Sequence, residues 1–189
     1  MRTHLMTAIG VALFACTAAD NDVTSDTTGA DSPASMAAPD PSVTAVVRDA
    51  SGRDLGTLTF SDTNGGIAVS GSLSGLAPGE HGLHLHMTGR CDPPAFESAG
   101  SHWNPTNRQH GSQNAEGPHL GDLPNVSVGS DSSATVQGVT PGGTLRGATD
   151  MLLDQDGAAV IVHTGPDDHR TNPSGGSGAP VACGVLSGA

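Results

Sequence analysis

The sequence predicts an all-β domain, an antiparallel sandwich or barrel, and three observations support this fold class. From Ser42 onward, short runs rich in Val, Thr and Leu alternate with turn clusters such as Asn64-Gly65-Gly66 and Pro141-Gly142-Gly143. The 189 residues include 27 glycines and 13 prolines, about a fifth of the chain, which indicates many turns without reaching the level of low-complexity disorder. No stretch has the apolar spacing of an amphipathic helix.

Eight segments have the composition and length of short strands. In chain order they are Ser42–Asp49, Asp54–Ser61, Gly66–Leu73, Gly82–Thr88, Asn125–Gly129, Ser133–Val139, Ala158–His163 and Val181–Leu186. Two long segments, Arg90–Leu123 and Thr164–Pro180, lack usable periodicity. Compact domains rarely keep such long loops without a function or a constraint, so we expect both to be functional loops.

The charge balance excludes several classes of protein. Seven arginines, no lysine and 19 acidic residues give a net charge of −12. A nucleic-acid-binding protein needs a basic face and a membrane-surface helix needs a polybasic one, and neither can be assembled here. No apolar run reaches the roughly 18 residues that span a bilayer. We therefore expect neither a nucleic-acid partner nor a transmembrane segment.

The N-terminus has the pattern of a signal peptide over residues 1–15. Arg2 precedes an apolar run of eleven residues, Leu5–Ala15, which has the length of a secretory core and is too short to span a membrane. Leu13-Phe14-Ala15-Cys16 resembles a bacterial lipobox and predicts lipidation of Cys16; the alternative is an ordinary signal peptide cut near Ala18. Either alternative predicts export to the periplasm or cell surface, a disulfide-permissive compartment, with membrane contact only through an N-terminal lipid anchor.

Residues 16–41 are predicted to be a disordered tether. The segment is rich in Ser, Thr, Ala, Asp and Pro, and it holds five acidic residues and no basic one. It either spaces the domain from a membrane anchor or is a tail without a role. The folded domain is expected over residues 42–189.

The histidines gather in one part of the domain, since eight of the nine fall between His81 and His169. His84-Leu85-His86 lies in an expected strand, where alternate residues share a face. Both imidazoles should therefore point one way while Leu83 and Leu85 point into the core. By itself, such a pair occurs on surface strands without any metal.

A second group lies in the first long loop. His102, His110 and His119 are spaced by eight and nine residues, and Asp122 follows three residues later. Three imidazoles and a carboxylate make a tetrahedral zinc set, and a bound metal would order the loop; the alternative is a solvated polar loop. His163 ends an apolar run and becomes a candidate ligand only if the fold brings it to the first pair.

The domain contains two cysteines, Cys91 and Cys183. In an exported protein such a pair predicts one disulfide, with two free thiols as the alternative. Cys16 is left over, which independently favours its lipidation.

The motifs occur together in an order that is specific. They are Gly79-Glu80-His81-Gly82-Leu83-His84-Leu85-His86, Ser98-Ala99-Gly100-Ser101-His102-Trp103-Asn104-Pro105, His110-Gly111, His119-Leu120-Gly121-Asp122-Leu123-Pro124-Asn125, Val162-His163 with Asp167-Asp168, and Ala182-Cys183-Gly184-Val185. Over Ser42–Ser187 the sequence resembles the bacterial copper,zinc superoxide dismutases. The resemblance implies an eight-stranded antiparallel Greek-key β-barrel, with Arg90–Leu123 as the metal loop and Thr164–Pro180 as the wall of a channel. It also implies the disulfide Cys91–Cys183.

The resemblance implies roles for individual residues. The copper ligands would be His84, His86, His102 and His163, and the zinc ligands would be His102, His110, His119 and Asp122. His102 would bridge the two metals, and His102 and His163 would be the catalytic residues. Asp167 would hydrogen-bond His84 and His110. His81 would be a buried structural histidine, and His169 matches no functional residue.

The implied reaction is the dismutation of superoxide to oxygen and hydrogen peroxide. Imidazoles hold both copper oxidation states, so the metal can be reduced by one superoxide and reoxidised by another. His102 would supply a proton to the departing peroxide, and zinc would fix the bridge and order the loop.

One position departs from the family. Members usually carry an arginine three residues before the last cysteine, at the mouth of the channel, where it attracts the anion; here that residue is Pro180. Arg170 could substitute in part, and Arg108 is a weaker candidate. The expected activity is therefore a slower dismutase. The alternatives are an exported copper-binding protein with little dismutase activity and a metal-free structural sandwich. Whether the domain forms a homodimer is left open.

Overall fold

The computed structural model describes residues 42–147 and 149–186. The predicted signal peptide, the lipidation site at Cys16 and the tether lie outside these residues. Within them, no helix has the length and apolar character needed to cross a membrane.

The described chain consists of nine strands and one short 3-10 helix. Their bounds are β1 (Val43–Asp49), β2 (Asp54–Thr63), β3 (Gly66–Ser74), β4 (Gly79–His81), β5 (Leu83–His86), η1 (Glu97–Ala99), β6 (Val126–Val128), β7 (Ser133–Val139), β8 (Ala158–His163) and β9 (Pro180–Leu186). The first long segment predicted as a loop contains no strand, and the second contains only Pro180, the first residue of β9; η1 is the one helical turn between β5 and β6.

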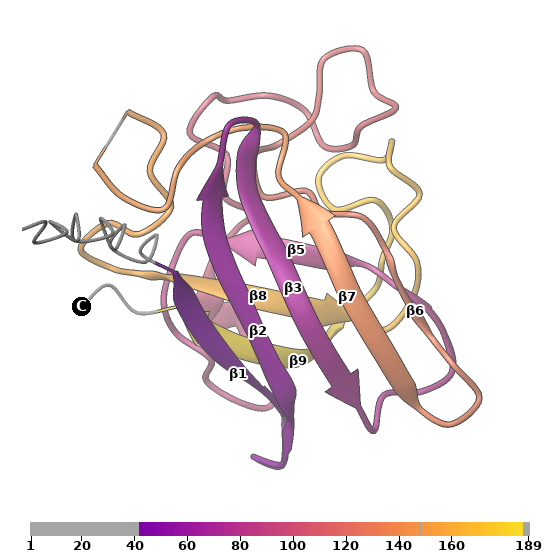
Figure 1. Cartoon of the computed structure of the whole chain (residues 1–189). Coiled ribbons are helices and arrows are strands. Elements are labelled where there is room, and N and C mark those ends of the chain that lie inside the picture. Colours follow the sequence, from indigo (N-terminus) through magenta and orange to yellow (C-terminus); the bar gives the residue numbers. More distant parts are fainter. Residues whose placement is uncertain (1–41, 148, 187–189) are drawn as a thin grey trace, which may run out of the picture. The chain divides into compact units, whose positions relative to one another are not determined.

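Seven strands form one antiparallel sheet in the order β5-β8-β9-β1-β2-β3-β7, and β4 and β6 form a separate pair. The sheet curls on itself, so that β5, β8 and β9 lie behind β1, β2, β3 and β7 in Figure 1. The neighbours β5 and β8, β9 and β1, and β3 and β7 are far apart in sequence. The predicted fold class, an antiparallel all-β sandwich or barrel, is confirmed.

Strand alternation places the core between the two halves of the curled sheet. In β1, Val43, Ala45 and Val47 are buried, and the residues between them are exposed. In contrast, every residue of β8 is buried. Val160 packs in the main core, whereas Ile161 on the other face packs in a second apolar cluster. That second cluster contains Phe96 and Ala99 of the first long loop, so this loop covers the outer face of β8.

One strand of the structure was not predicted. The segment predicted as a strand over Gly82–Thr88 contains β5, and β4 precedes this segment and is separated from β5 by a break at Gly82. The break has a physical cause: Gly82 uses both backbone groups on the second long loop and on β8, donating to the Gly165 carbonyl at 2.8 Å and accepting from His163 N–H at 2.9 Å. The structure therefore has nine strands where eight were predicted.

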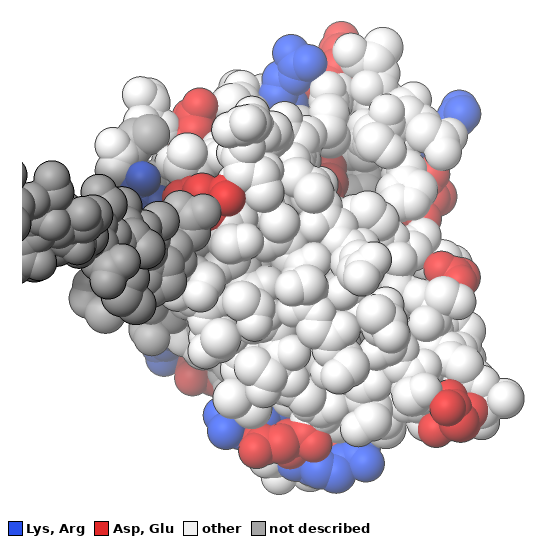
Figure 2. Space-filling model, viewed as in Figure 1, with Lys and Arg blue, Asp and Glu red and all other residues white. Residues whose placement is uncertain are grey.

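The outer face of β1, β2, β3 and β7 is nearly free of charge, and the charged residues gather around its margin in Figure 2. The register places hydroxyl and amide side chains side by side on this face, as in the rows Thr57–Ser72–Thr135 and Thr59–Ser70–Gln137. No histidine lies in these four strands.

Candidate metal centre

The centre begins with the alternation of β5. Leu83 and Leu85 are buried in the main core, while His84 and His86 project from the opposite face. Both histidines are buried there, because the first long loop covers them. The period of two in the sequence therefore predicted the direction of all four side chains.

Two arms of the long loop pair with β5 through the backbone. The Leu85 N–H donates to the Gly121 carbonyl at 2.9 Å, and the Trp103 N–H donates to the Leu85 carbonyl at 2.8 Å. This pairing sets His102 opposite His86 and Asp122 opposite His84 in isolated bridges. Residues twenty positions apart in the loop are thus fixed along one edge of β5, whose other edge pairs with β8.

Four histidines form a first cluster: His84, His86, His102 and His163. One ring nitrogen from each lies within 4.8 Å of the others, and all four side chains are buried. The ring centroids of His84 and His102 are 4.1 Å apart, and those of His84 and His163 are 4.8 Å apart. The fold therefore brings His163 from β8 to the pair on β5.

In three of these histidines, one ring nitrogen makes a hydrogen bond and the other makes none. His86 Nδ1 lies 2.7 Å from the Gly100 carbonyl, and His163 Nδ1 lies 2.9 Å from the Gly178 carbonyl. A carbonyl can only accept, so these nitrogens carry the protons. The buried Nε2 atoms of both rings, and Nδ1 of His84, have no hydrogen-bond partner. Free lone pairs converging in a buried space are what a histidine-ligated metal requires.

Asp122 is the centre of a second cluster. Its Oδ1 atom lies 3.1 Å from His102 Nδ1, 2.9 Å from His110 Nδ1 and 3.3 Å from His119 Nδ1. Its other oxygen accepts the backbone N–H groups of Gly111 and His119 at 2.9 and 3.0 Å, which fixes the carboxylate. Three imidazoles and one carboxylate match the donor set of a tetrahedral zinc site.

His102 belongs to both clusters. Its Nδ1 faces Asp122, and its ring packs against those of His84 and His86 on the other side. One imidazole with two nitrogens can ligate a metal on each side, so the two clusters can act as one binuclear centre.

Asp167 connects the two clusters from behind. Its carboxylate accepts from His84 Nε2 at 2.7 Å and from His110 Nε2 at 3.0 Å, and all three side chains are fully buried. The bonds leave Nδ1 of each histidine directed to its cluster. Asn125 braces the backbone of Asp167, donating to its carbonyl and accepting its N–H, each at 2.9 Å.

Burial and the carboxylates set the protonation of the centre. Burial lowers the pKa of His84 and that of His86 to about 3, and it lowers the pKa of His163 as well. Burial also acts to lower the pKa of His110, but the hydrogen bonds with Asp122 and Asp167 outweigh it and raise that pKa to about 9. Burial acts to raise the pKa of Asp122, yet its three histidine partners hold it far below its usual value. The imidazoles of His84, His86 and His163 are therefore neutral and able to bind a metal at physiological pH.

A pocket of about 660 Å³ opens onto the first cluster. Its wall includes His86, His102 and His163, and its rim comes from both long loops. A small molecule in this pocket therefore comes close to the first cluster, with the free nitrogens of His86 and His163 buried beneath the pocket wall.

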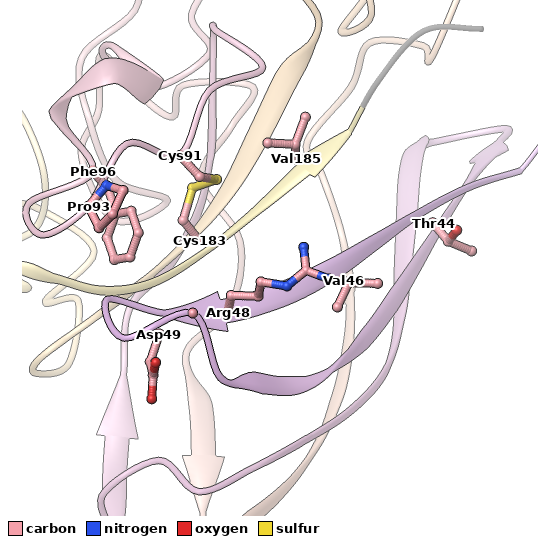
Figure 3. Close-up of a pocket in the computed structure, with 10 residues that line it drawn as sticks. Thr44, Val46, Arg48, Asp49, Cys91, Pro93, Phe96, Cys183 and Val185 are labelled. Atoms are coloured by element: carbon pink, nitrogen blue, oxygen red, sulfur yellow. A yellow bond between two sulfur atoms is a disulfide. The ribbon is translucent and has the colours of Figure 1, made fainter.

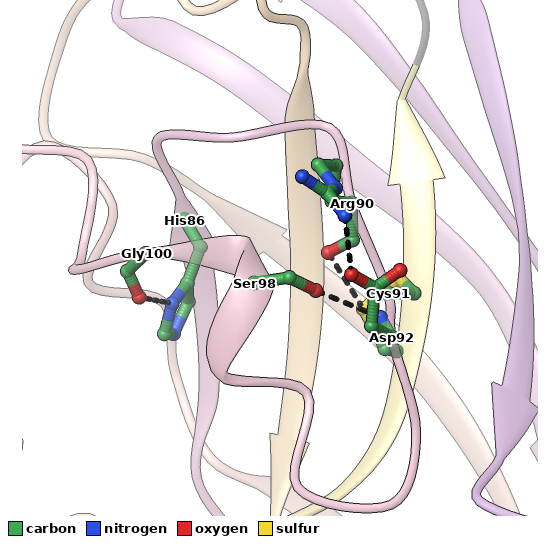
Figure 4. Close-up of a disulfide and its surroundings, with 7 residues drawn as sticks. His86, Arg90, Cys91, Asp92, Ser98 and Gly100 are labelled. Carbon is green, nitrogen blue, oxygen red and sulfur yellow. Dashed lines mark hydrogen bonds and ion pairs between the residues drawn. A yellow bond between two sulfur atoms is a disulfide. The ribbon is translucent and has the colours of Figure 1, made fainter.

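The disulfide Cys91–Cys183 ties the start of the long loop to β9. Beside the disulfide, the Asp92 N–H donates to Ser98 Oγ at 2.8 Å. Gly100, two residues after Ser98, accepts a hydrogen bond from the ring of His86 through its carbonyl (Figure 4). The predicted disulfide is thus present, and a short path of contacts leads from it to the first cluster.

A second pocket, of about 400 Å³, lies beside the disulfide and away from the histidines. It is bounded by the outer side chains of β1, by Pro93 and Phe96, and by Val185 (Figure 3). It contains none of the predicted ligands.

Two histidines stay outside the clusters. His81 Nδ1 lies 2.6 Å from the His163 carbonyl and its Nε2 lies 2.8 Å from the Ala77 carbonyl, so neither nitrogen is directed at a cluster. His169 is partly exposed, and its backbone N–H donates to Asp167 Oδ1 at 2.6 Å.

A family model described as copper/zinc superoxide dismutase (SODC) matches residues 55–186, most of the chain. The chain belongs to the copper/zinc superoxide dismutase family. Its matched region contains both histidine clusters and both cysteines of the disulfide. These buried clusters are suited to the metals that give the family its name.

Several relatives support the assignment. The chain is 43% identical over 148 residues to a protein of Caulobacter vibrioides named superoxide dismutase [Cu-Zn], covering 77% of this chain and 85% of that protein. A crystal structure of a SOD-like protein from Bacillus subtilis is 38% identical, with a TM-score of 0.73 over 76% of this chain and 97% of the other. The Cu/Zn superoxide dismutase from Brucella abortus is 29% identical, with a TM-score of 0.64 over 78% of this chain and 100% of the other.

Sequence reasoning missed three parts of this dismutase-family centre. Asn125 belongs to the same motif as Asp122, so its place in the motif was a signal that it is functional. The hydrogen bonds of Asn125 to Asp167, however, depend on the fold. The carbonyls of Gly100 and Gly178 orient two ligands, and backbone groups give no sequence signal. The position of Arg108 is the third part: Arg108 lines the pocket over the first cluster and Arg170 does not, although the sequence favoured Arg170 as the substitute cation.

Proposed function

We propose that this protein dismutates superoxide to oxygen and hydrogen peroxide. The observation that carries the proposal is His102, one imidazole shared by a four-histidine cluster that borders a pocket and by the three-histidine, one-carboxylate cluster around Asp122. Such an arrangement suits a redox metal that the substrate can reach, with a structural metal behind it.

The residues of each cluster have assigned roles in this proposal. His84, His86, His102 and His163 would hold copper, and His102, His110, His119 and Asp122 would hold zinc. Copper bound there would supply one-electron chemistry, and zinc would fix the shared imidazole. His86 and His163 line the pocket, so these two residues would hold the reacting centre next to the place where substrate enters.

Proton delivery is the role proposed for His102. Its Nδ1 faces the ionised Asp122, and the ring borders the pocket. When Nε2 is not holding copper, it would take up a proton on the pocket side and donate it to the product peroxide. Asp167 keeps the rings of His84 and His110 in one orientation during this exchange.

We propose a rate below that of relatives with an arginine at the channel mouth. Pro180 lies opposite His163 in the register of β8 and β9, so an arginine there would place a positive charge near the first cluster. In a protein of net charge −12, a missing local cation leaves an anionic substrate less strongly attracted.

An exported copper-binding protein with little dismutase activity is the second candidate function. The similarity to the SOD-like protein of Bacillus subtilis and the proline at position 180 both favour it. The same four histidines would hold copper in that case, and turnover would be the property that separates the two candidates.

The test is the decay of superoxide, followed by pulse radiolysis, with the full chain loaded with copper and zinc. We expect a rate that rises with protein concentration, and a further increase with Pro180→Arg. Stoichiometric binding of both metals without turnover would overturn the dismutase proposal and support the copper-binding one.

For the N-terminal segment we propose export and lipidation at Cys16, on the basis of the apolar run and the lipobox-like Leu13-Phe14-Ala15-Cys16. Cys16→Ser is then expected to move the protein from the membrane fraction to the soluble exported fraction. Membrane association unchanged by this substitution would contradict lipidation.

A further inference from the structure

The wall of the pocket over the first cluster carries a positive charge, although the protein as a whole is strongly acidic. Its wall contains one arginine, Arg108, and no aspartate or glutamate. The other polar side chains of the wall, apart from the histidines, are neutral amides and hydroxyls such as Asn104, Asn107 and Asn172. The chain as a whole has 19 acidic residues against seven basic ones, so the absence of a carboxylate from this wall sets it apart.

Arg108 is held in place by its own loop. The Asn104 side chain clamps the backbone of residue 108, donating to its carbonyl at 2.9 Å and accepting its N–H at 3.0 Å. One guanidinium nitrogen of Arg108 donates to the Gly117 carbonyl at 3.0 Å. The group thus has a fixed anchor and keeps several N–H donors for other partners.

No carboxylate of the described residues neutralises Arg108. The arginines Arg48, Arg53 and Arg90 are each paired with an aspartate. Arg170 donates to Gln113 Oε1 at 3.0 Å and does not line the pocket. Among the described residues, Arg108 is therefore the one arginine that offers an unneutralised positive charge to the entrance of the first cluster.

We propose that Arg108 attracts the anionic substrate into the pocket, in place of a cation at position 180. A fixed charge at the rim of a cleft without opposing carboxylates raises the local concentration of a small anion and speeds its arrival. The effect is screened by salt, because the guanidinium is exposed. This inference rests on the proposed function for the identity of the anion, but the anion-attracting property of Arg108 can be measured separately.

The test uses azide, a small anion that ligates copper, titrated into the full chain loaded with copper and zinc and followed by copper absorption. Arg108→Gln is expected to weaken azide binding by about threefold to tenfold at low salt and to flatten its salt dependence. Arg108→Lys keeps the charge and should stay within about twofold of the parent. Arg170→Gln is the matched control, with the same charge change outside the pocket, and should have no effect.

Neutral imidazole, titrated at a pH above its pKa, checks that Arg108→Gln has not distorted the centre, and its affinity should be unchanged. An azide affinity of Arg108→Gln within twofold of the parent would overturn the inference. So would an equal loss in Arg170→Gln, or an equal loss of imidazole affinity.

Measurement of superoxide turnover in the same variants separates this inference from the proposed function. Azide binding that weakens in Arg108→Gln, in a protein without turnover, would support Arg108 as the anion-attracting residue and reject the dismutase. Turnover that is equal in the parent and in Arg108→Gln, with the same salt dependence, would support the dismutase and reject the role of Arg108.

Discussion

Gly175 lies directly against Asp167. A methyl group at Gly175 would be 1.8 Å from Asp167 Oδ1 and 2.7 Å from His110 Nε2, the two atoms of one hydrogen bond. The backbone at Gly175 has φ +64°, and Gly176 beside it has φ +63° with only Asp168 Oδ2 near, at 3.9 Å. The second long loop therefore makes room for the carboxylate that connects the two clusters.

This pair of glycines allows a matched comparison. Gly175→Ala is expected to displace Asp167 and to weaken zinc binding by about tenfold, in addition to the cost of about 1–2 kcal/mol for an alanine in a left-handed conformation. Gly176→Ala has the same backbone cost without the clash, so its zinc affinity should match the parent. Competition with a chromophoric chelator measures both, and equal affinities in the two variants would contradict the role of Gly175.

Asp167→Asn removes the carboxylate that accepts from both His84 and His110. An amide can accept only through its oxygen, so one of the two rings loses its partner and its fixed orientation. We expect a loss of about 10- to 100-fold in zinc affinity, as for other groups that orient metal ligands. Asp168→Asn, at an exposed neighbour that faces no ligand ring, is the control. A zinc affinity of Asp167→Asn within threefold of the control would exclude a coupling role.

The disulfide is expected to stabilise both the fold and the first cluster. Cys91→Ser with Cys183→Ser opens a link across 92 residues and should lower the free energy of unfolding by about 2–4 kcal/mol. Contacts of Asp92, Ser98 and Gly100 connect Cys91 to the ring of His86. Opening the disulfide should therefore loosen His86 and lower the affinity for copper as well. Urea unfolding and copper competition, compared with the chemically reduced parent, check both effects. A reduced parent as stable as the oxidised protein would refute this.

The metal-free protein should be most stable near neutral pH. The pKa of His84 and His86 is lowered to about 3 and that of His163 is lowered too, so the unfolded chain binds more protons than the folded one below about pH 6.5. Stability therefore falls on acidification, by about 1.4 kcal/mol per pH unit for each such histidine. His110 has the opposite sign: its pKa is raised to about 9, and its contribution is lost as pH rises from about 6.5 to 9. Urea unfolding of the metal-free chain from pH 4.5 to 9 should show this maximum, and stability that rises steadily toward pH 4.5 would contradict it.

Local patterns made part of the fold and centre predictable from the sequence. The alternation in Leu83-His84-Leu85-His86 needs only strand geometry, and the structure places the four side chains as that geometry requires. The strand predicted from Gly82 begins one residue later, after a break from β4 at Gly82, because Gly82 bonds to two distant segments, and such tertiary contacts leave no local pattern.

The remaining parts depend on contacts between loops. Local pattern alone does not join His163 to the first pair; the family resemblance implied it, and the pairing of β5 with β8 brings it there. The position of Arg108 follows from the clamp by Asn104, and that of Asp167 from Asn125, which is 42 residues away in sequence. Long loops have no period from which the direction of a side chain can be derived, so Arg170 was ranked above Arg108 on sequence alone.

The most direct measurement is superoxide turnover by pulse radiolysis in the metal-loaded full chain, compared between His163→Ala and His169→Asn. His163 directs a buried free nitrogen into the first cluster, whereas His169 is partly exposed and sits in a left-handed conformation that asparagine tolerates. If the four-histidine cluster is the dismutase centre, the parent and His169→Asn turn over superoxide, and His163→Ala loses turnover while it keeps zinc. A parent that holds both metals and does not accelerate superoxide decay would contradict the assignment.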